Sequence, residues 1–315
     1  MKHSERPILV TGAHRTGTTW VGKMLAADED VAYISEPLNV LHRPGVFRAP
    51  VKHWYTYINK ENEAEFLPAF NELLDFDYHL WNEIRSIRSH KDFLRMGRDF
   101  HIFYAANLHG QRALLKDPFA VFSLPWFAEK LNCQIIVTVR HPAAFASSLK
   151  RLDWSFDFSD LLNQPLLMRD HLEPFRADIQ SVSADDVIGQ AALLWTMIYR
   201  VVHAALRPAQ DDARERIPSI QIARHEDLSL DPIAGYRKLY ESLELNFTAR
   251  IEQAVLNSSS AENPAELSKK KVHSVKLDSR ANLDNWKNRL TPDEINRIRK
   301  ITEEAARDFY PDTNW

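Results

Sequence analysis

The chain has 315 residues, of which 44% are hydrophobic and 26% are charged. This composition excludes an intrinsically disordered chain, because such chains have fewer apolar residues and a larger net charge. The 40 basic and 43 acidic side chains leave a formal net charge of only -3, so no general attraction to nucleic acid or anionic membranes is expected. Any binding site for an anion must therefore be local.

Glycine and cysteine are both scarce in this chain. Three of the 8 glycines lie close together near the N-terminus, at Gly12, Gly17 and Gly22. Cys133 is the single cysteine, so no intrachain disulfide can form, and this suits a reducing compartment. The first residues lack the pattern of a signal peptide, and no uninterrupted apolar run is long enough to span a membrane. We therefore expect a cytoplasmic protein without a membrane anchor.

Short strands alternate with helices in the predicted secondary structure. Apolar, β-branched runs predict strands at 8–11, 31–35, 112–116, 134–139 and 219–223. Helical periodicity predicts helices at 20–30, 63–75, 90–107, 121–131, 143–152, 185–206, 233–243 and 291–309. The last helix should begin with a capping box of Thr291 and Glu294, with Pro292 at its first position. This alternation predicts an α/β fold with a mostly parallel central sheet.

Other segments do not follow this alternation. Residues 38–110 and 153–180 are rich in aromatic side chains and histidine, and 153–180 has no clear periodicity. Residues 257–280 contain serine, proline and lysine runs that indicate a loop. No linker divides the chain, so we expect one domain over 1–315 with insertions at 38–110 and 153–180.

The segment between the first strand and the first helix has the spacing of a phosphate-binding loop. Gly12 and Gly17 stand in a GxxxxG pattern, which lets backbone N–H groups turn toward an anion at a helix N-terminus. Nucleotide hydrolases need a lysine after the second glycine, but Thr18 stands there and Arg15 is the only cationic side chain inside the loop. The candidate anion-binding residues of the loop are Gly12, Ala13, His14, Arg15, Thr16, Gly17, Thr18 and Thr19.

A second candidate anion site follows the strand at 134–139. Arg140 comes directly after this uncharged strand, and Ser147 and Ser148 follow in the next helix. Ligands of open α/β sheets bind at the carboxyl ends of the strands. An arginine fork and serine hydroxyls at that edge favour a phosphate group.

Together, TGAHRTGTTW (11–20) and VRHPAAFASSL (139–149) resemble the two signatures of sulfotransferases that use 3′-phosphoadenosine-5′-phosphosulfate (PAPS). The resemblance continues in RHEDLSLDP (224–232) and NWKN (285–288), so it spans nearly the whole chain. It implies a P-loop-like three-layer α/β/α fold without a metal. It also implies that the loop binds the 5′-phosphosulfate of PAPS. Arg140 and Ser148 would bind the 3′-phosphate, both of PAPS and of the product adenosine 3′,5′-bisphosphate (PAP).

The chain departs from the family pattern at two places. The family's R-K-G loop reads Ser279-Arg280-Ala281, which leaves Arg280 as its one candidate for a 3′-phosphate contact. The catalytic histidine of the cytosolic branch is missing, because Lys116 is followed by Asp117 and Pro118. The opening segment is instead closer to carbohydrate sulfotransferases, in which a Glu-Pro pair after the second strand supplies a carboxylate near the sulfate.

The resemblance implies sulfuryl transfer to an acceptor hydroxyl of a carbohydrate or other small molecule. Glu36 is the predicted base, Arg15 and Lys116 are predicted to stabilise the leaving phosphate, and His14 is a rival base. The acceptor is expected over 38–110 and 153–180, while its identity and the oligomeric state stay open. The alternatives are a P-loop nucleotide kinase or hydrolase and a non-catalytic nucleotide-binding protein of the same fold.

Overall fold

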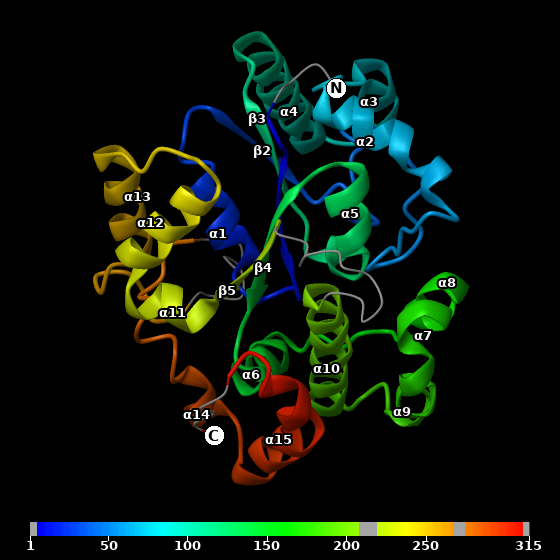
Figure 1. The fold of residues 1–315 in the computed structure, drawn as a ribbon, viewed down its shortest axis with the longest axis vertical. Helices are drawn as coiled ribbons and strands as arrows, with labels where there is room; N and C mark the ends of the chain where they lie inside the picture. Colours follow the sequence, from blue (N-terminus) through cyan, green and yellow to red (C-terminus); the bar gives the residue numbers. More distant parts are fainter. Residues whose placement is uncertain (1–4, 208–218, 267–274, 311–314) are drawn as a thin grey trace.

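Five parallel strands form the centre of the computed structural model, which describes residues 5–207, 219–266, 275–310 and 315 (Figure 1). The sheet order is β2-β3-β1-β4-β5. The strands are β1 Ile8–Gly12, β2 Val31–Ser35, β3 Arg112–Lys116, β4 Gln134–Val139 and β5 Ile220–Arg224. All five predicted strands are confirmed to within one residue, and the predicted parallel α/β fold is confirmed with them.

Helices cover both faces of the sheet and make three layers (Figure 1). The α-helices are α1 Thr18–Leu25, α2 Leu67–Leu74, α3 Leu80–Ser86, α4 His90–His109, α5 Leu124–Lys130, α6 Pro142–Leu152, α7 Ser159–Leu162, α8 Pro165–Leu167, α9 Arg176–Ser181, α10 Val187–Leu206, α11 His225–Leu230, α12 Pro232–Ser242, α13 Ala249–Ser259, α14 Asn285–Arg289 and α15 Pro292–Ala306. Shorter turns are the 3-10 helices η1 Glu63–Glu65, η2 Pro118–Ser123 and η4 Glu173–Phe175 and the π-helix η3 Met168–Leu172.

Alternating side chains of the strands feed two separate apolar cores. On β1, Leu9 packs into the larger core with α6 and α10, while Ile8 and Val10 pack into the smaller core with α1, α12 and α13. This follows from strand geometry, because successive side chains point to opposite faces of a sheet. A strand buried on both faces reads as a continuous apolar run, which is why the five strands were visible in the sequence.

The structure corrects several predicted segments. Residues 153–180, predicted as irregular, fold mostly into short helices whose apolar side chains, such as Leu161 and Leu172, are buried. Helices α3 and α13 were not predicted, and α13 occupies the start of the predicted loop 257–280. Part of that loop, 267–274, lies outside the described residues. The capping box of Thr291 and Glu294 is confirmed at the start of α15.

Helix α10 is central to the larger core. Among the described residues it is the one helix long and apolar enough to cross a membrane, and 78% of that stretch is buried inside the protein, against α6 and α15. Two of its side chains hold the end of β4. Trp195 donates to the carbonyl oxygen of Arg140 at 2.9 Å, and Tyr199 donates to that of Thr138 at 2.7 Å.

His141 lies just beyond β4, where aromatic residues near the C-terminus enclose its ring. The imidazole stacks on Trp286 at a centroid distance of 5.3 Å and meets Tyr310 at 5.5 Å and Trp315 at 4.7 Å. Neither ring nitrogen has a hydrogen-bond partner within the described parts of the chain. Burial and nearby cationic side chains lower the pKa of His141 to about 4.

Folding stability should therefore fall in acid. A histidine with a pKa of 6.5 unfolded and about 4 folded contributes stability that is complete above pH 6.5 and is lost as the pH falls toward 4. His141→Phe keeps the aromatic packing and removes this titration. Between about pH 7.5 and about pH 5, we expect the variant to gain about 2 kcal/mol in unfolding free energy relative to the wild type, as measured by urea unfolding. An equal loss in both proteins would contradict a buried neutral imidazole.

Candidate active site

The loop between β1 and α1 has the backbone that its glycines suggested. Gly12 and Gly17 have φ values of 134° and 103°, in the region that side chains rarely adopt. A Cβ on Gly12 would lie 2.3 Å from the carbonyl oxygen of Thr138 on β4, and a Cβ on Gly17 would lie 3.0 Å from the ring of His225. These two positions therefore admit only glycine without a shift of the neighbouring backbone or ring.

Hydrogen bonds from three directions hold the loop in this shape. Thr16 donates to the carbonyl oxygen of Ala13 at 2.6 Å, and its hydroxyl lies 2.7 Å from that of Thr138. The backbone N–H of Ala13 donates to the Tyr199 hydroxyl at 3.4 Å. On the opposite side the backbone N–H of His14 donates to the Tyr55 hydroxyl at 3.4 Å. Such bracing prepares the loop before a ligand arrives, which lowers the cost of binding.

A cleft opens beside the loop and is rich in arginine. Arg15 donates from Nε to the Ser148 hydroxyl at 3.2 Å, so the two sequence sites meet here. Arg140 also lies in the cleft. Burial, and then the charge of Arg140, lowers the pKa of Arg15 to about 10, and burial lowers the pKa of Arg140 as well. The lining residues are Arg15, Gly17, Thr18, Thr19, Trp20, Arg140, Ser148, Arg151, His225, Ser258, Glu266, Val275, Leu277, Ser279, Asn282 and Arg289.

Sequence reasoning missed two arginines of this cleft. Arg151, at the end of α6, and Arg289, at the end of α14, both contact Glu266, at 3.0 Å and 2.9 Å. Arg289 also donates to the Ser147 hydroxyl at 3.3 Å. Arg151 lies three residues after Ser148 on the same helix, and this spacing was the available signal for it. Arg289 comes from a distant segment and had no such signal.

The contact of Arg280 with a 3′-phosphate stays a prediction. The Arg280 guanidinium donates to the carbonyl oxygen of Leu230 at 2.7 Å and 3.2 Å, and the residue does not line the cleft. The neighbouring Ser279 does line the cleft, and its hydroxyl donates to the carbonyl oxygen of Ser229 at 3.0 Å. Arg289, by contrast, lines the cleft.

One wall of the cleft is aromatic. The Trp20 indole lies on the first turn of α1, donates to the Ser258 hydroxyl at 2.8 Å and packs edge-on against Tyr236 at 5.4 Å. The ring of His225 lies 5.8 Å from that of Trp20. A flat indole fixed in this way next to an arginine cluster offers a stacking surface beside an anion site.

Glu36 and Lys116 form an ion pair on the other side of the loop. Lys116 ends β3, Glu36 follows β2, and β3 lies between β2 and β1. The backbone N–H of Glu36 donates to the carbonyl oxygen of Lys116 at 2.8 Å. The side-chain amide of Asn39 donates to the second carboxylate oxygen of Glu36 at 2.8 Å. A Cβ on Gly22 would lie 3.0 Å from the Lys116 side chain, so this glycine makes room for the lysine.

The residue after Lys116 holds the turn that carries Glu36. The buried Asp117 carboxylate accepts the N–H of Leu38 at 2.6 Å and the N–H of Phe119 at 3.0 Å. Burial raises the pKa of Asp117 to about 7.

Arg15, Glu36 and Tyr55 all have positive φ values, of 68°, 53° and 56°. Such backbone is costly outside glycine and gathers at functional sites, where the surrounding structure holds it in place.

His14 is poorly suited to act as a base. Its Nδ1 lies 2.5 Å from the hydroxyl of Tyr55. Burial, and then the charge of Arg15, lowers the pKa of His14 to about 4, so this imidazole is a weaker base than an ordinary histidine. If the tyrosine O–H donates to Nδ1, the remaining ring proton sits on Nε2 and no basic nitrogen is left. The geometry therefore favours Glu36 over His14.

The model of the sulfotransferase domain family matches residues 5–310. A search of curated proteins found no match.

Solved structures that resemble the chain are sulfotransferases at low identity. The sulfotransferase domain of the Synechococcus PCC 7002 olefin synthase is 17% identical, with 99% of this chain and 98% of that chain covered and a TM-score of 0.46. STF1 of Mycobacterium tuberculosis is 19% identical, with 86% and 76% covered and a TM-score of 0.40. Mouse SULT7A1, solved with PAP, is 12% identical, with 96% and 84% covered and a TM-score of 0.46.

The family model covers nearly the whole chain, from the glycine loop through the cleft arginines to the C-terminal helix. The chain therefore belongs to the sulfotransferase domain family.

Proposed function

We propose that this sulfotransferase takes its sulfuryl group from PAPS and transfers it to a hydroxyl of a small-molecule or carbohydrate acceptor. One observation carries the proposal. The cleft beside the lysine-free loop gathers four arginines, Arg15, Arg140, Arg151 and Arg289, and its described lining holds a single carboxylate. That charge layout fits a ligand with phosphate groups at two ends better than a triphosphate with a metal.

The donor's parts match separate parts of the site. The backbone amides of the loop and Arg15 would hold the 5′-phosphosulfate at the start of α1. Arg140, Ser148 and Arg289 would hold the 3′-phosphate. Trp20 supplies a flat surface on which a purine can stack.

The reaction needs little covalent chemistry from the protein. The acceptor oxygen attacks sulfur, the bond between sulfur and the oxygen of the 5′-phosphate breaks, and the acceptor proton passes to Glu36. Lys116 and Arg15 then face the charge that develops on the leaving phosphate, as in phosphoryl transfer. The ion pair with Lys116 also fixes the position of the Glu36 carboxylate.

The acceptor would bind where the two insertions meet the loop. His14 contacts Tyr55 from the insertion at 38–110. The ring centroid of His14 lies 6.4 Å from that of Trp154, which belongs to the insertion at 153–180. Trp154 is also 5.8 Å from the Arg15 guanidinium and remains partly exposed. An exposed indole at that place suits stacking on a sugar or an aromatic ring.

PAP should stabilise the protein, and ATP with magnesium should not. At a hundredfold excess over its dissociation constant, PAP should raise the melting temperature by roughly 2 to 4 °C. Arg140→Gln should lose most of that shift, because Arg140 would hold the phosphate that ATP lacks. Differential scanning fluorimetry measures both. Stabilisation by ATP with magnesium alone would favour the nucleotide kinase or hydrolase instead.

Two variants test which arginine binds the 3′-phosphate: Arg289, which lines the cleft, or Arg280, which the family motif indicates. Arg289→Ala should weaken PAP binding by about tenfold or more, because a charge-assisted hydrogen bond contributes roughly 1.5–3 kcal/mol. Arg280→Ala, outside the cleft, should change it by less than about threefold. Isothermal titration calorimetry gives both constants, and the opposite order would return the role to Arg280.

Glu36→Gln tests the base. The amide keeps the size of the side chain but cannot take the acceptor proton, so turnover should fall by about a hundredfold or more. PAP binding should stay close to that of the wild type, because Glu36 does not line the cleft, and this serves as the check on folding. Product formation is followed by mass spectrometry as the gain of one sulfuryl group on the acceptor. A turnover near the wild-type value would remove Glu36 from the mechanism.

A further inference from the structure

Helices α3 and α4 bury acidic side chains and expose large apolar ones. Glu83 and Asp99 are buried, at 1% and 7% exposure, while Trp81 and Leu94 are 73% and 69% exposed. Carboxylates normally face water, and large apolar side chains normally face the core. This segment does the reverse.

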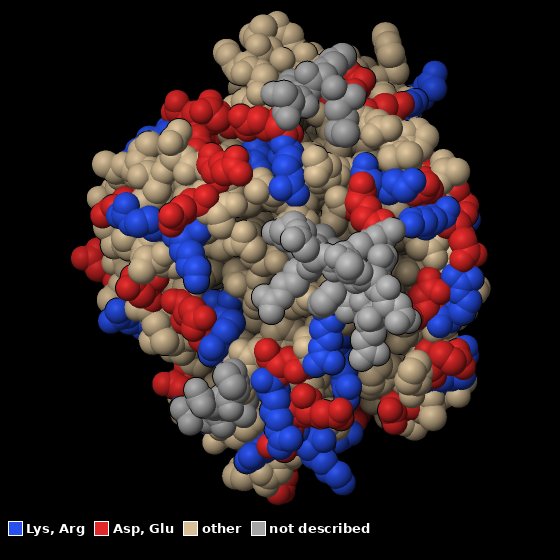
Figure 2. Space-filling view, viewed as in Figure 1, with Lys and Arg blue, Asp and Glu red and all other residues tan. Residues whose placement is uncertain are grey.

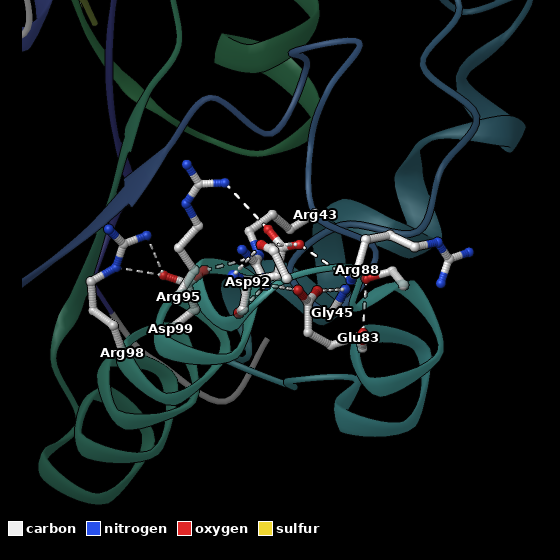
Figure 3. A network of polar contacts seen from close by, with 10 residues as sticks. Arg43, Gly45, Glu83, Arg88, Asp92, Arg95, Arg98 and Asp99 are labelled. Carbon is white, nitrogen blue, oxygen red and sulfur yellow. Dashed lines mark hydrogen bonds and ion pairs between the residues drawn. The ribbon is translucent and has the colours of Figure 1, made fainter.

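Arg43 accounts for the buried acids (Figure 3). It forms ion pairs with Glu83 of α3 and with Asp99 of α4, the latter at 3.4 Å, and it donates to the carbonyl oxygen of Asp92 at 3.2 Å. Glu83 also accepts the N–H of Gly45 at 2.8 Å. These paired contacts fix which side of each helix faces inward. The outward position of the apolar side chains is therefore part of a defined packing arrangement.

The exposed side of α4 forms one continuous apolar stripe. Helical spacing places Phe93, Gly97, Phe100, Tyr104 and Leu108 along one side of the helix, with Leu94 beside them, and we call these six residues the α4 face. Four of its apolar side chains are at least 60% exposed. The Phe100 and Tyr104 rings stack at 6.1 Å, and nothing lies within 4 Å of a Cβ built on Gly97. In Figure 2, uncharged atoms form the tip of the molecule where Figure 1 places α4.

Cationic side chains border the α4 face. Helical spacing places Lys91, Arg95 and Arg98 in a row between the apolar stripe and the buried side of α4. Arg95 pairs with Asp92 at 3.4 Å and Arg98 pairs with the buried Asp99 at 2.7 Å, so this row of three cations meets two carboxylates and keeps an excess of positive charge (Figure 3). Although the whole chain has a net charge of -3, this surface combines exposed aromatic and aliphatic side chains with a cationic border.

We propose that the α4 face docks on an anionic lipid bilayer. An interfacial helix has an aromatic and aliphatic side that enters the headgroup region and a basic border that meets the lipid phosphates, and α4 has both. A second copy of the chain is the alternative occupant, and the experiment below distinguishes it from a bilayer.

Vesicle flotation tests this docking surface. The full chain should float with vesicles of phosphatidylcholine and phosphatidylglycerol in equal parts and should stay behind with phosphatidylcholine alone. Phe93→Ser combined with Leu94→Ser should lower the partition coefficient by about tenfold or more, because two apolar side chains no longer enter the bilayer. Lys91→Gln combined with Arg95→Gln should also lower it, most clearly at low salt.

Leu256→Ser on α13, another exposed leucine, is the matched control and should bind vesicles like the wild type. The PAP-induced rise in melting temperature verifies that each variant is folded. Failure to float with anionic vesicles, or flotation that the Phe93 and Leu94 substitutions leave unchanged, would overturn the proposal. So would a concentration-dependent dimer in light scattering that these substitutions abolish, because the α4 face would then belong to a second copy.

Discussion

The structure depends on the concentration of positive charge at one edge of a parallel sheet. Arg15 and Arg140 are largely removed from water, and burial lowers the pKa of each. Like charges that lie next to one another away from water are unfavourable, and a nearby anion offsets that cost. Glu266 offsets part of it through Arg151 and Arg289, and a phosphate of the proposed donor would offset more.

The sheet order makes this arrangement possible. Because β1 lies between β3 and β4, its glycine loop has Lys116 on one side and Arg140 on the other. One side joins the loop to Glu36, and the other joins it to the arginines of the cleft. The proposed donor cleft and the proposed base thus follow different strands, while Tyr55, which braces the loop, comes from the segment 38–110.

The features that could be predicted from the sequence, the five strands and the glycine loop, are those that a short local pattern determines. Buried parallel strands are continuous apolar runs, and the loop of Gly12 and Gly17 is a short motif with fixed geometry. Arg289 was not visible, because its place in the cleft depends on how α14 packs against α6. Arg280 was assigned from a family motif that this chain keeps only in part, and in this structure its guanidinium donates to a backbone carbonyl.

The segment 153–180 was harder to predict for a related reason. Its helices are too short to show a clear period, and their stability comes from burial of side chains such as Leu161 and Leu172 in the larger core. The inversion on α4 was equally hidden, since an alternation of aromatic and charged residues looks the same whichever side faces inward. The burial of Glu83 and Asp99 and their ion pairs with Arg43 show that these carboxylates face inward.

The proposed function requires that the cleft arginines recognise a second phosphate on an adenosine nucleotide. It is tested most directly by calorimetric titration with PAP and with adenosine 5′-phosphate, which differ only in the 3′-phosphate. The account predicts that PAP binds about a hundredfold more tightly or better, since at least two charge-assisted contacts depend on that group. Affinities for the two nucleotides within about threefold of each other would contradict it.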